Sequence, residues 1–410
     1  MAFMRVSRMG LGVAALCLSA ISCGGGGGGA STTPPPPPPP GPAANTASVI
    51  VDQGPASVGS VNTLYTTVTV CVPGSTTSCQ TIDHIQVDTG SYGLRLLAPV
   101  LTLTLPVETL SSGGSLVECT QFVDGYSWGP VALADVQIAG ETAHSLPVQV
   151  IGDPRFTNIP AKCSGTGTEE DTVASFGANG ILGVGPFELD CGDCDTVAGG
   201  LYYACAATCS VTTVPLTMQV ANPVTQFATD KNGIIVVLPS VAAGGAANVS
   251  GSLIFGIDTQ SNNQSGTQSV LTVDGNGYLL ITFNGQTLAN SFIDSGSNGI
   301  YFNDSSISKC VAPPNDPTSQ IVNFYCPANT LSFGLSIQGM NGVMVNNMTF
   351  GVGNAQTMLN NPFDAFPQLA GANPNTGSFD YGLAFFYGRR VAVAVEGATT
   401  SVGTGPYIGF

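Results

Sequence analysis

Charge is scarce in this sequence. Only 8% of its 410 residues are charged, and 9 basic residues stand against 25 acidic ones, which gives a formal net charge of −16. So few basic residues disfavour nucleic acid or any other polyanion as a partner. Histidine is rarer still, with two residues in the whole chain. Two histidines give little basis for a Ser-His-Asp hydrolase and are too few for a zinc site built from several histidines.

Other common signatures are missing too. The sequence contains no phosphate-binding loop and no dinucleotide fingerprint, so we expect no cofactor. Its longest candidate membrane segment is residues 11–21, which is too short for a stable bilayer span. This run follows two arginines and ends in small residues, a pattern that predicts an export signal over residues 1–22. The following motif, AISC, resembles the lipobox of bacterial lipoproteins and implies lipidation of Cys23, with simple secretion as the alternative.

Residues 23–47 have a composition that builds no core. Residues 24–29 are all glycine and behave as a flexible coil, whereas residues 34–40 are all proline and form a stiff extended rod. We interpret this segment as a tether that holds an exported domain away from a membrane. Gly24 takes the place of the aspartate associated with inner-membrane retention, which favours the outer membrane, on its periplasmic or outer face.

Cysteine is the residue that marks the exported part of the chain. An even number of cysteines follows Cys23, which predicts disulfides in an oxidising compartment. We expect local disulfides between Cys71 and Cys79 and between Cys310 and Cys326, and a third disulfide between Cys119 and Cys163. The remaining four cysteines should pair among themselves within one loop: Cys191, Cys194, Cys205 and Cys209. The spacing of the last four also fits a metal site, which is the alternative for that loop.

One short pattern occurs twice. The sequence reads VDTGS at residues 87–91 and IDSGS at residues 293–297, each at the end of an apolar run. In each, a strand delivers one carboxylate into a turn whose glycine permits backbone angles closed to other residues. A hydrophobic-hydrophobic-glycine element follows each acid at a similar distance: Gly183 lies 95 residues after Asp88 (183 − 88), and Gly382 lies 88 after Asp294 (382 − 294). Each half therefore has the same order of elements, which indicates an internal duplication.

Length and periodicity predict two β-rich lobes. A chain of 410 residues exceeds one ordinary core. Short alternating runs separated by glycine, asparagine and proline predict strands from about residue 47 onward, including a hairpin with an Asn284-Gly285 turn, and one weak helix at residues 216–228. A polar span at residues 258–268 is the expected boundary. The predicted lobes are therefore residues 48–265 and 266–410.

With these motifs the sequence resembles the pepsin-like aspartic peptidases over nearly all of the exported part. The resemblance implies an all-β fold of two related barrel-like lobes with a cleft between them, a monomer, and a polypeptide substrate. It implies that Asp88 and Asp294 are the catalytic pair. Neighbouring residues would support them: Thr89, Gly90, Ser91, Ser295, Gly296 and Ser297 in the turns, and Gly183 and Gly382 in the strands behind.

Chemistry agrees with that implication. Two carboxylates in contact cannot both ionise cheaply, so they share a proton. The ionised group can take a proton from water while the other polarises a carbonyl, and no covalent intermediate is needed. The resemblance also implies a hairpin flap over the substrate, with Phe122 or Tyr126 at the position of its aromatic residue. Two functions follow, an exported aspartic endopeptidase attached to a membrane only by its lipid, and a non-catalytic surface binding protein on the same scaffold.

Overall fold

The computed structural model describes residues 44–410 apart from residues 57, 124, 267, 315 and 317–318. Strands dominate it, in agreement with the predicted all-β class. The first half contains β1 (Thr46–Val51), β2 (Leu64–Cys71), β3 (Cys79–Asp88), β4 (Tyr92–Leu97), β5 (Ser115–Gln121), β6 (Gly125–Ile138), β7 (Glu141–Ile151), β8 (Thr168–Glu169), β9 (Gly180–Val184), β10 (Tyr202–Cys205), β11 (Cys209–Val211), β12 (Gly233–Val237) and β13 (Val249–Phe255).

The second half continues with strands of similar length. They are β14 (Val270–Thr272), β15 (Leu279–Phe283), β16 (Gln286–Ile293), β17 (Ile300–Tyr301), β18 (Leu331–Gln338), β19 (Met344–Val352), β20 (Ala370–Gly371), β21 (Asp380–Tyr381), β22 (Arg390–Ala394), β23 (Thr399–Thr400), β24 (Gly403–Thr404) and β25 (Tyr407–Gly409). The helices of the described residues are about one turn long: α1 (Ala161–Ser164), α2 (Val173–Phe176), α3 (Ala355–Leu359), η1 (Ala98–Val100), η2 (Leu216–Met218), η3 (Pro223–Gln226), η4 (Gln320–Asn323) and η5 (Leu383–Phe385).

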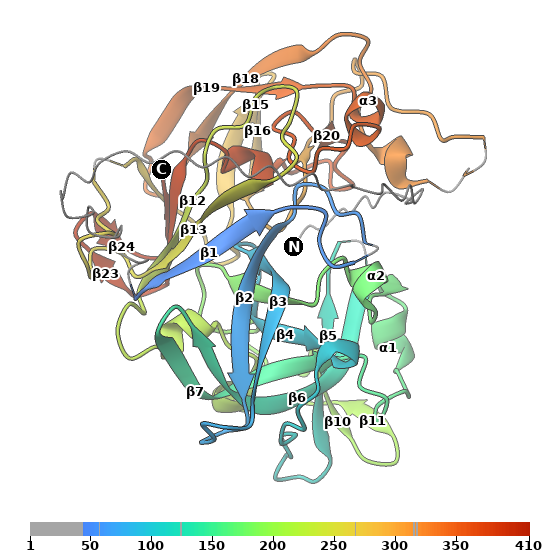
Figure 1. Cartoon of the computed structure of the whole chain (residues 1–410), viewed down its shortest axis with the longest axis vertical. Helices are drawn as coiled ribbons and strands as arrows, with labels where there is room; N and C mark the ends of the chain where they lie inside the picture. Colours follow the sequence, from blue (N-terminus) through green and yellow to red (C-terminus); the bar gives the residue numbers. More distant parts are fainter. Residues whose placement is uncertain (1–43, 57, 124, 267, 315, 317–318) are drawn as a thin grey trace, which may run out of the picture.

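One large sheet joins the two halves. Its strand order runs from β11 through β6, β9 and β3 to β1, β13 and β12, and then continues into β22, β25 and β14. The crossing from one half to the other is the antiparallel β12–β22 pair, which runs from Gly233 opposite Ala394 to Val237 opposite Arg390. Figure 1 shows β1, β12 and β13 between a lower body of blue and green strands and an upper body of orange strands. The halves are thus continuous through hydrogen bonds.

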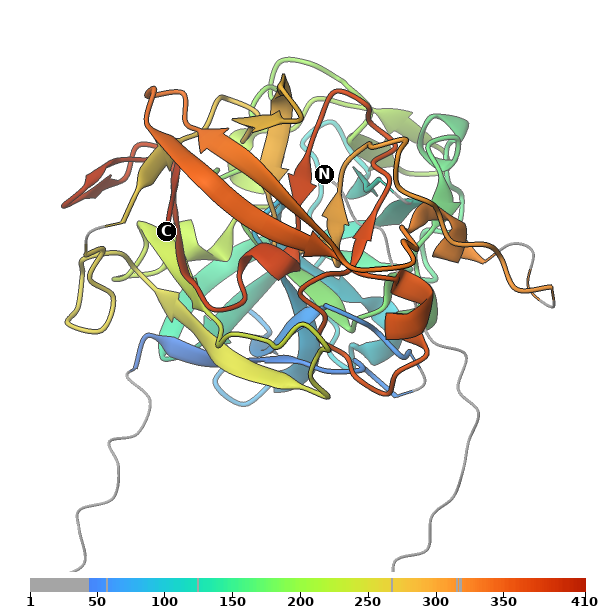
Figure 2. The ribbon, with the colours of Figure 1, turned by 90° about the horizontal axis from the view of Figure 1, so that it is seen from above.

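The second half also has a sheet of its own. Its order is β19-β18-β15-β16-β21-β17-β20, and the long β18–β19 hairpin forms its edge. Seen from above in Figure 2, this orange hairpin lies across the upper face of the molecule. Phenylalanines pack at its base, with ring centroids 5.0 Å apart for Phe283 and Phe302 and 5.3 Å apart for Phe302 and Phe379. These contacts support strand β16, which leads to Asp294.

Several local predictions can be compared with these elements. The Asn284-Gly285 turn is confirmed, because Phe283 pairs with Gln286 and both central residues have positive φ. The predicted helix at 216–228 is wrong. The segment contains two short helices, η2, which ends at Met218, and η3, which begins at Pro223, a residue that cannot continue a preceding helix. β1 begins at Thr46, two residues before the predicted start of the domain.

The predicted disulfides are confirmed, and the loop cysteines pair as Cys191 with Cys194 and Cys205 with Cys209, beside Cys71–Cys79, Cys119–Cys163 and Cys310–Cys326. The predicted export signal, the lipid site at Cys23 and most of the tether lie outside the described residues. Within the described ranges, no helix has the length and apolar character needed to span a bilayer.

Candidate functional site

The first acid turn connects β3 to β4. Asp88 is the last residue of β3, and its carboxylate is held by the turn that follows. The Gly90 N–H donates to Asp88 Oδ1 at 2.7 Å, and the Ser91 hydroxyl donates to Asp88 Oδ2. Donors on both oxygens fix the plane of the carboxyl group.

The second acid turn has the same arrangement. Asp294 follows the end of β16, the Gly296 N–H donates to Asp294 Oδ1 at 2.7 Å, and the Ser297 hydroxyl donates to Asp294 Oδ2 at 3.1 Å. The predicted supporting residues therefore touch the predicted acids, glycine N–H to one oxygen and serine hydroxyl to the other. The repeat in the sequence is a repeat in hydrogen bonding.

The two turns are bonded to each other. The Thr89 N–H donates to the Ser295 hydroxyl at 3.1 Å, and the Ser295 N–H donates to the Thr89 hydroxyl at 3.0 Å. The Ser295 hydroxyl in turn donates to the Val87 carbonyl at 2.8 Å. Gln86 adds a fourth bond, from its side-chain amide to the Gly296 carbonyl at 2.9 Å. Four buried bonds between residues more than 200 positions apart hold the turns in one register.

This bracing brings the two carboxyl groups together. A Cβ added to Gly90 would lie 2.7 Å from Cγ of Asp294, so the Asp294 carboxyl group lies against the backbone of the Asp88 turn. Asp88 and Asp294 are 0% and 1% exposed. Burial raises the pKa of Asp294 well above its usual value, and the charge and hydrogen bond of Asp88 raise it further. The two carboxyl groups therefore form a coupled pair that shares a proton.

Glycine is required behind both acids. Asp88 pairs in parallel with Gly183 of β9, and Asp294 donates its N–H to the carbonyl of Tyr381, just before Gly382. A Cβ on Gly183 would lie 2.5 Å from the Tyr92 nitrogen, and one on Gly382 would lie 2.3 Å from the Gly299 carbonyl oxygen. Both distances are shorter than a real Cβ contact, so each predicted glycine permits a close backbone approach to its turn.

A third buried acid lies next to the pair. Asp380 opposes Phe292 in the parallel β16–β21 pair, is 0% exposed, and has no hydrogen-bond partner for either carboxyl oxygen among the described residues. Burial raises the pKa of Asp380 well above its usual value, an effect that the nearby Ser297 hydroxyl partly offsets. Its charge contributes to the raised pKa of Asp294. Asp380 was not predicted from the sequence; its signal is an acid inside the otherwise apolar run that leads to Gly382.

The two flap candidates occupy different places. They flank the turn of the β5–β6 hairpin, where the Phe122 N–H donates to the Gly125 carbonyl at 2.8 Å. Phe122 packs edge-on against Phe176, in the buried cluster that contains Ile181 of β9. Tyr126 packs in a separate buried cluster with Trp128. Phe122 is thus the candidate whose neighbours lead to the strand behind Asp88.

A buried ionic network supports β4 and was also missed. Arg95 is 2% exposed and contacts Glu118 at 2.5 Å and Asp190 at 2.9 Å. The Tyr202 hydroxyl donates to the other oxygen of Asp190 at 2.7 Å. Burial and the negative charge of Glu118 raise the pKa of Asp190. The network fixes Asp190 where the stapled loop begins.

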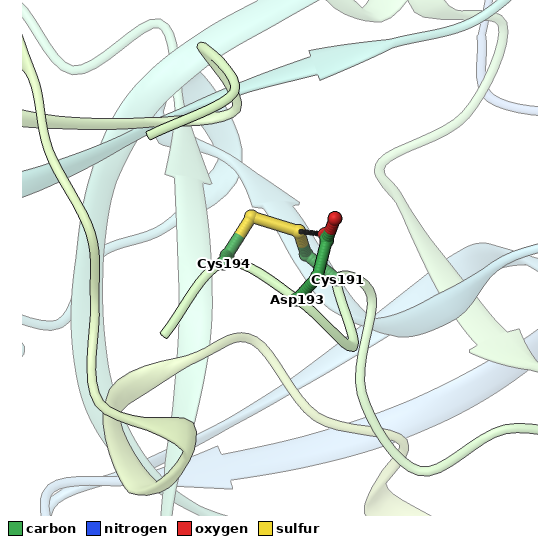
Figure 3. A group of neighbouring side chains, drawn as sticks. All are labelled: Cys191, Asp193 and Cys194. Atoms are coloured by element: carbon green, nitrogen blue, oxygen red, sulfur yellow. Dashed lines mark hydrogen bonds between the residues drawn. A yellow bond between two sulfur atoms is a disulfide. The ribbon is translucent and has the colours of Figure 1, made fainter. Parts of the chain in front are cut away.

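The stapled loop carries a group of residues with metal-ligand chemistry. The ligand atoms of Cys191, Asp193 and Cys194 lie within 4.8 Å of one another. Figure 3 shows these three side chains, with the disulfide between the two cysteines. The two sulfur atoms form a disulfide with each other and thus offer no thiolate. The remaining pair of cysteines, Cys205 and Cys209, is oxidised as well. The metal alternative for this loop is therefore wrong for the oxidised protein.

Comparison with known families places the chain without assigning it an activity. Residues 41–410 match the model of a family described as a protein of unknown function, DUF3443. Because this match covers most of the sequence, the chain belongs to that family. No curated protein matches the chain.

Proposed function

We propose that the protein is an exported aspartic endopeptidase with a pepsin-like bilobal fold, in which Asp88 and Asp294 activate a water molecule against a peptide bond. The observation that carries the proposal is the pair itself, two buried carboxyl groups held side by side by reciprocal bonds between two turns of the same design. A structural turn has no need of a second acid against its backbone, because like charges in a buried place cost free energy.

The roles follow from the hydrogen bonds and the burial. Asp294, whose pKa is raised, holds the shared proton and acts as the general acid toward the substrate carbonyl. Asp88, whose carboxyl oxygens are positioned by Gly90 and Ser91, takes a proton from the attacking water. The proton taken by Asp88 then passes to the leaving amine as the C–N bond breaks. A hydroxyl of the tetrahedral intermediate returns its proton to Asp294, which restores the pair for the next cycle.

The test is cleavage of an unfolded protein by the purified full-length chain at acidic to neutral pH. Changing Asp88→Asn or Asp294→Asn should each lower kcat by about 10²- to 10⁴-fold, the usual contribution of a general acid or base. A statine-type inhibitor should block the wild type. Glu108→Gln, an acid change outside both turns, serves as the control and should leave cleavage unchanged. Activity that survives either aspartate change would exclude the two-acid mechanism.

Export and anchoring are part of the same proposal. They rest on the sequence of residues 1–47 alone, because the Cys23 site lies outside the described residues. Mass spectrometry of the protein purified from membranes should find a mature chain that begins with a lipid-bearing Cys23. An unmodified chain in the secreted fraction would contradict the anchor and leave the proposed chemistry intact.

A non-catalytic binding role on the same scaffold is the second candidate. It is favoured by the burial of Phe122. A flap that opens and closes over a substrate needs a mobile aromatic residue at its tip, whereas Phe122 packs in a buried cluster with Ile181 of β9. This role predicts no turnover in the cleavage assay. It also predicts that ligand binding is insensitive to Asp88→Asn and Asp294→Asn, whereas the peptidase requires both acids.

A further inference from the structure

A cavity of about 710 Å³ opens beside the acid pair. One part of its wall is Thr89 and Gly90, from the turn that holds Asp88. Another part is Phe292 and Ile293, the strand residues that lead to Asp294. A chain extended over the two carboxyl groups can therefore place a neighbouring side chain in this cavity.

Acidic residues gather in the wall of the cavity. Its lining includes Glu188, Asp190, Asp193 and Glu396, and no lysine, arginine or histidine from the described residues. Asp190 is already paired with buried Arg95. The other three acids make no ion pair within the described part of the chain. Two of them accept hydrogen bonds from uncharged donors: Glu188 accepts one from the Gln226 side-chain amide at 3.0 Å, and Glu396 accepts one from the Glu188 N–H at 3.0 Å.

The Tyr92 side chain provides a second, independent sign of a ligand. Tyr92 lines the cavity, is 6% exposed, and its hydroxyl makes no hydrogen bond to any described residue. That hydroxyl lies 3.5 Å from where a Cβ of Gly277 would stand, and Gly277 is also in the lining. The hydroxyl therefore has no hydrogen-bond partner among the described residues and can donate to or accept from a group that enters the cavity.

Aromatic rings complete the wall. Tyr92 and Phe187 meet edge-on with centroids 5.4 Å apart, and both line the cavity together with Tyr278. Aromatic faces attract cations, and the attraction grows as water is excluded. A cavity with acids at its rim, aromatic faces inside and a free hydroxyl has the features that a long cationic side chain requires, an apolar path for its stem and acceptors for its head.

We propose that this cavity binds a lysine or arginine side chain of an extended polypeptide and so selects the bond presented to Asp88 and Asp294. The inference rests on the proposed peptidase function for its role in selecting bonds, but the binding step does not require turnover. An acidic side chain would meet like charges, and an aliphatic one would offer no hydrogen-bonding group to the Tyr92 hydroxyl.

The experiment uses paired peptides that differ only in one charge. Arginine is compared with citrulline, its neutral analogue of nearly the same shape, at each position of an otherwise neutral peptide. With the purified full-length protein we expect one position near the cleaved bond where citrulline lowers kcat/KM by about 10-fold, since each attraction between exposed charges is weak and three of them act together.

Two variants locate the preference in the cavity. Glu188→Gln combined with Glu396→Gln keeps the hydrogen bonds and removes two charges, and should reduce the arginine-to-citrulline ratio to about 2- to 3-fold. Tyr92→Phe should lower the affinity for the arginine peptide by a smaller factor. Glu108→Gln removes one charge outside the cavity and should leave the ratio unchanged. A ratio near one in the wild type, or one that the double variant leaves unaltered, would overturn the inference.

Failure of the peptidase proposal gives a different result. If no peptide is cleaved, the same pairs are titrated calorimetrically against the wild type and the double variant. Tighter binding of the arginine peptide, lost in the double variant, would support the cavity assignment in a non-catalytic protein. Equal binding of the two peptides would reject it.

Discussion

The two acid turns share one design, but the strands behind them differ. In the first half, Gln86 opposes Ile181 in the parallel β3–β9 pair. In the second half, Phe292 opposes Asp380 at the same register of the β16–β21 pair. Gln86 reaches across to the other turn, whereas Asp380 is a buried acid without a hydrogen-bond partner among the described residues.

This difference shows which features of the duplicated unit are constrained. The turn residues are alike because each set positions a carboxyl group and bonds to the opposite turn. The strand pairs two residues before the acids have diverged. In the first half the acid-bearing strand has the polar crosslink of Gln86, and in the second half the strand behind has the added charge of Asp380. The halves differ in their bracing as well: four of the five disulfides lie in the first half, while the second has packed phenylalanines.

The largest expected effect is on the feature that both halves retain. Gly183→Ala and Gly382→Ala should each lower the free energy of unfolding by about 3 kcal/mol, since the new Cβ would meet backbone atoms that cannot move aside. Gly382→Ala should cost more, because two carbonyl oxygens lie within 2.4 Å of its Cβ. Denaturant unfolding followed by the fluorescence of the single tryptophan gives the measurement.

Gly244→Ala is the matched control for these changes. A Cβ at Gly244 would contact nothing within 4 Å, so the free energy of unfolding should change little. Equal values for all three variants would show that the strands behind the acids are not closely packed against the turns.

The next effect separates the two halves. Asp380→Ile gives the second half the residue found at Ile181, and should stabilise the protein at pH 7. A buried carboxyl group with a raised pKa costs stability once the pH exceeds its unfolded value of about 4, and this cost disappears as the pH falls below that value. The stability difference between Asp380→Ile and wild type should therefore shrink on acidification. Thermal unfolding at several pH values measures it.

The reverse exchange and the activity profile test the same residue. Ile181→Asp should destabilise the first half by about 1–3 kcal/mol, the cost of a buried polar group without a partner.

In the proposed mechanism, Asp380→Ile also removes one cause of the raised pKa of Asp294. The proton on Asp294 would then be lost at a lower pH, and the alkaline limit of cleavage should move down. An unchanged limit would mean that Asp380 does not act on the pair.

The smallest effect concerns the bonds between the turns. Ser295→Ala removes a hydroxyl that accepts from Thr89 and donates to Val87, and should cost about 2 kcal/mol. Thr89→Val removes one that accepts from Ser295, and should cost about 1 kcal/mol. Denaturant unfolding of the two variants gives the comparison. A larger loss of unfolding free energy for Thr89→Val than for Ser295→Ala would contradict this expected order.

The sequence predicted the local parts of the site well. Asp88 and Asp294 with their glycines and serines were found because each set lies within five residues and the turn chemistry is short-range. The same holds for the disulfides and for the Asn284-Gly285 turn. In each case the bonding partners are neighbours in the chain or members of a small set.

The features that were not predicted depend on pairing between strands that are far apart in the sequence. Asp380 lies 86 residues after Asp294 (380 − 294), and only the parallel register with Phe292 brings it to the pair. Arg95 finds Glu118 and Asp190 through strand order that no local pattern encodes. The continuity of the sheet from β12 to β22 was likewise invisible, because alternation predicts strands without naming their partners.

Strand β1 has a practical consequence for shortened versions of the protein. It pairs with β13 along all six of its residues and with β2 at its end, so it fills a gap between two other strands. Just before it, the Asn45 side chain donates to the Phe255 carbonyl at 2.8 Å. A truncation beginning at Ser48 would remove part of this hydrogen-bonded ladder and expose unpaired backbone groups of β13, with which another chain could pair. Recombinant fragments that begin no later than Ala44 should accordingly stay soluble where shorter ones associate.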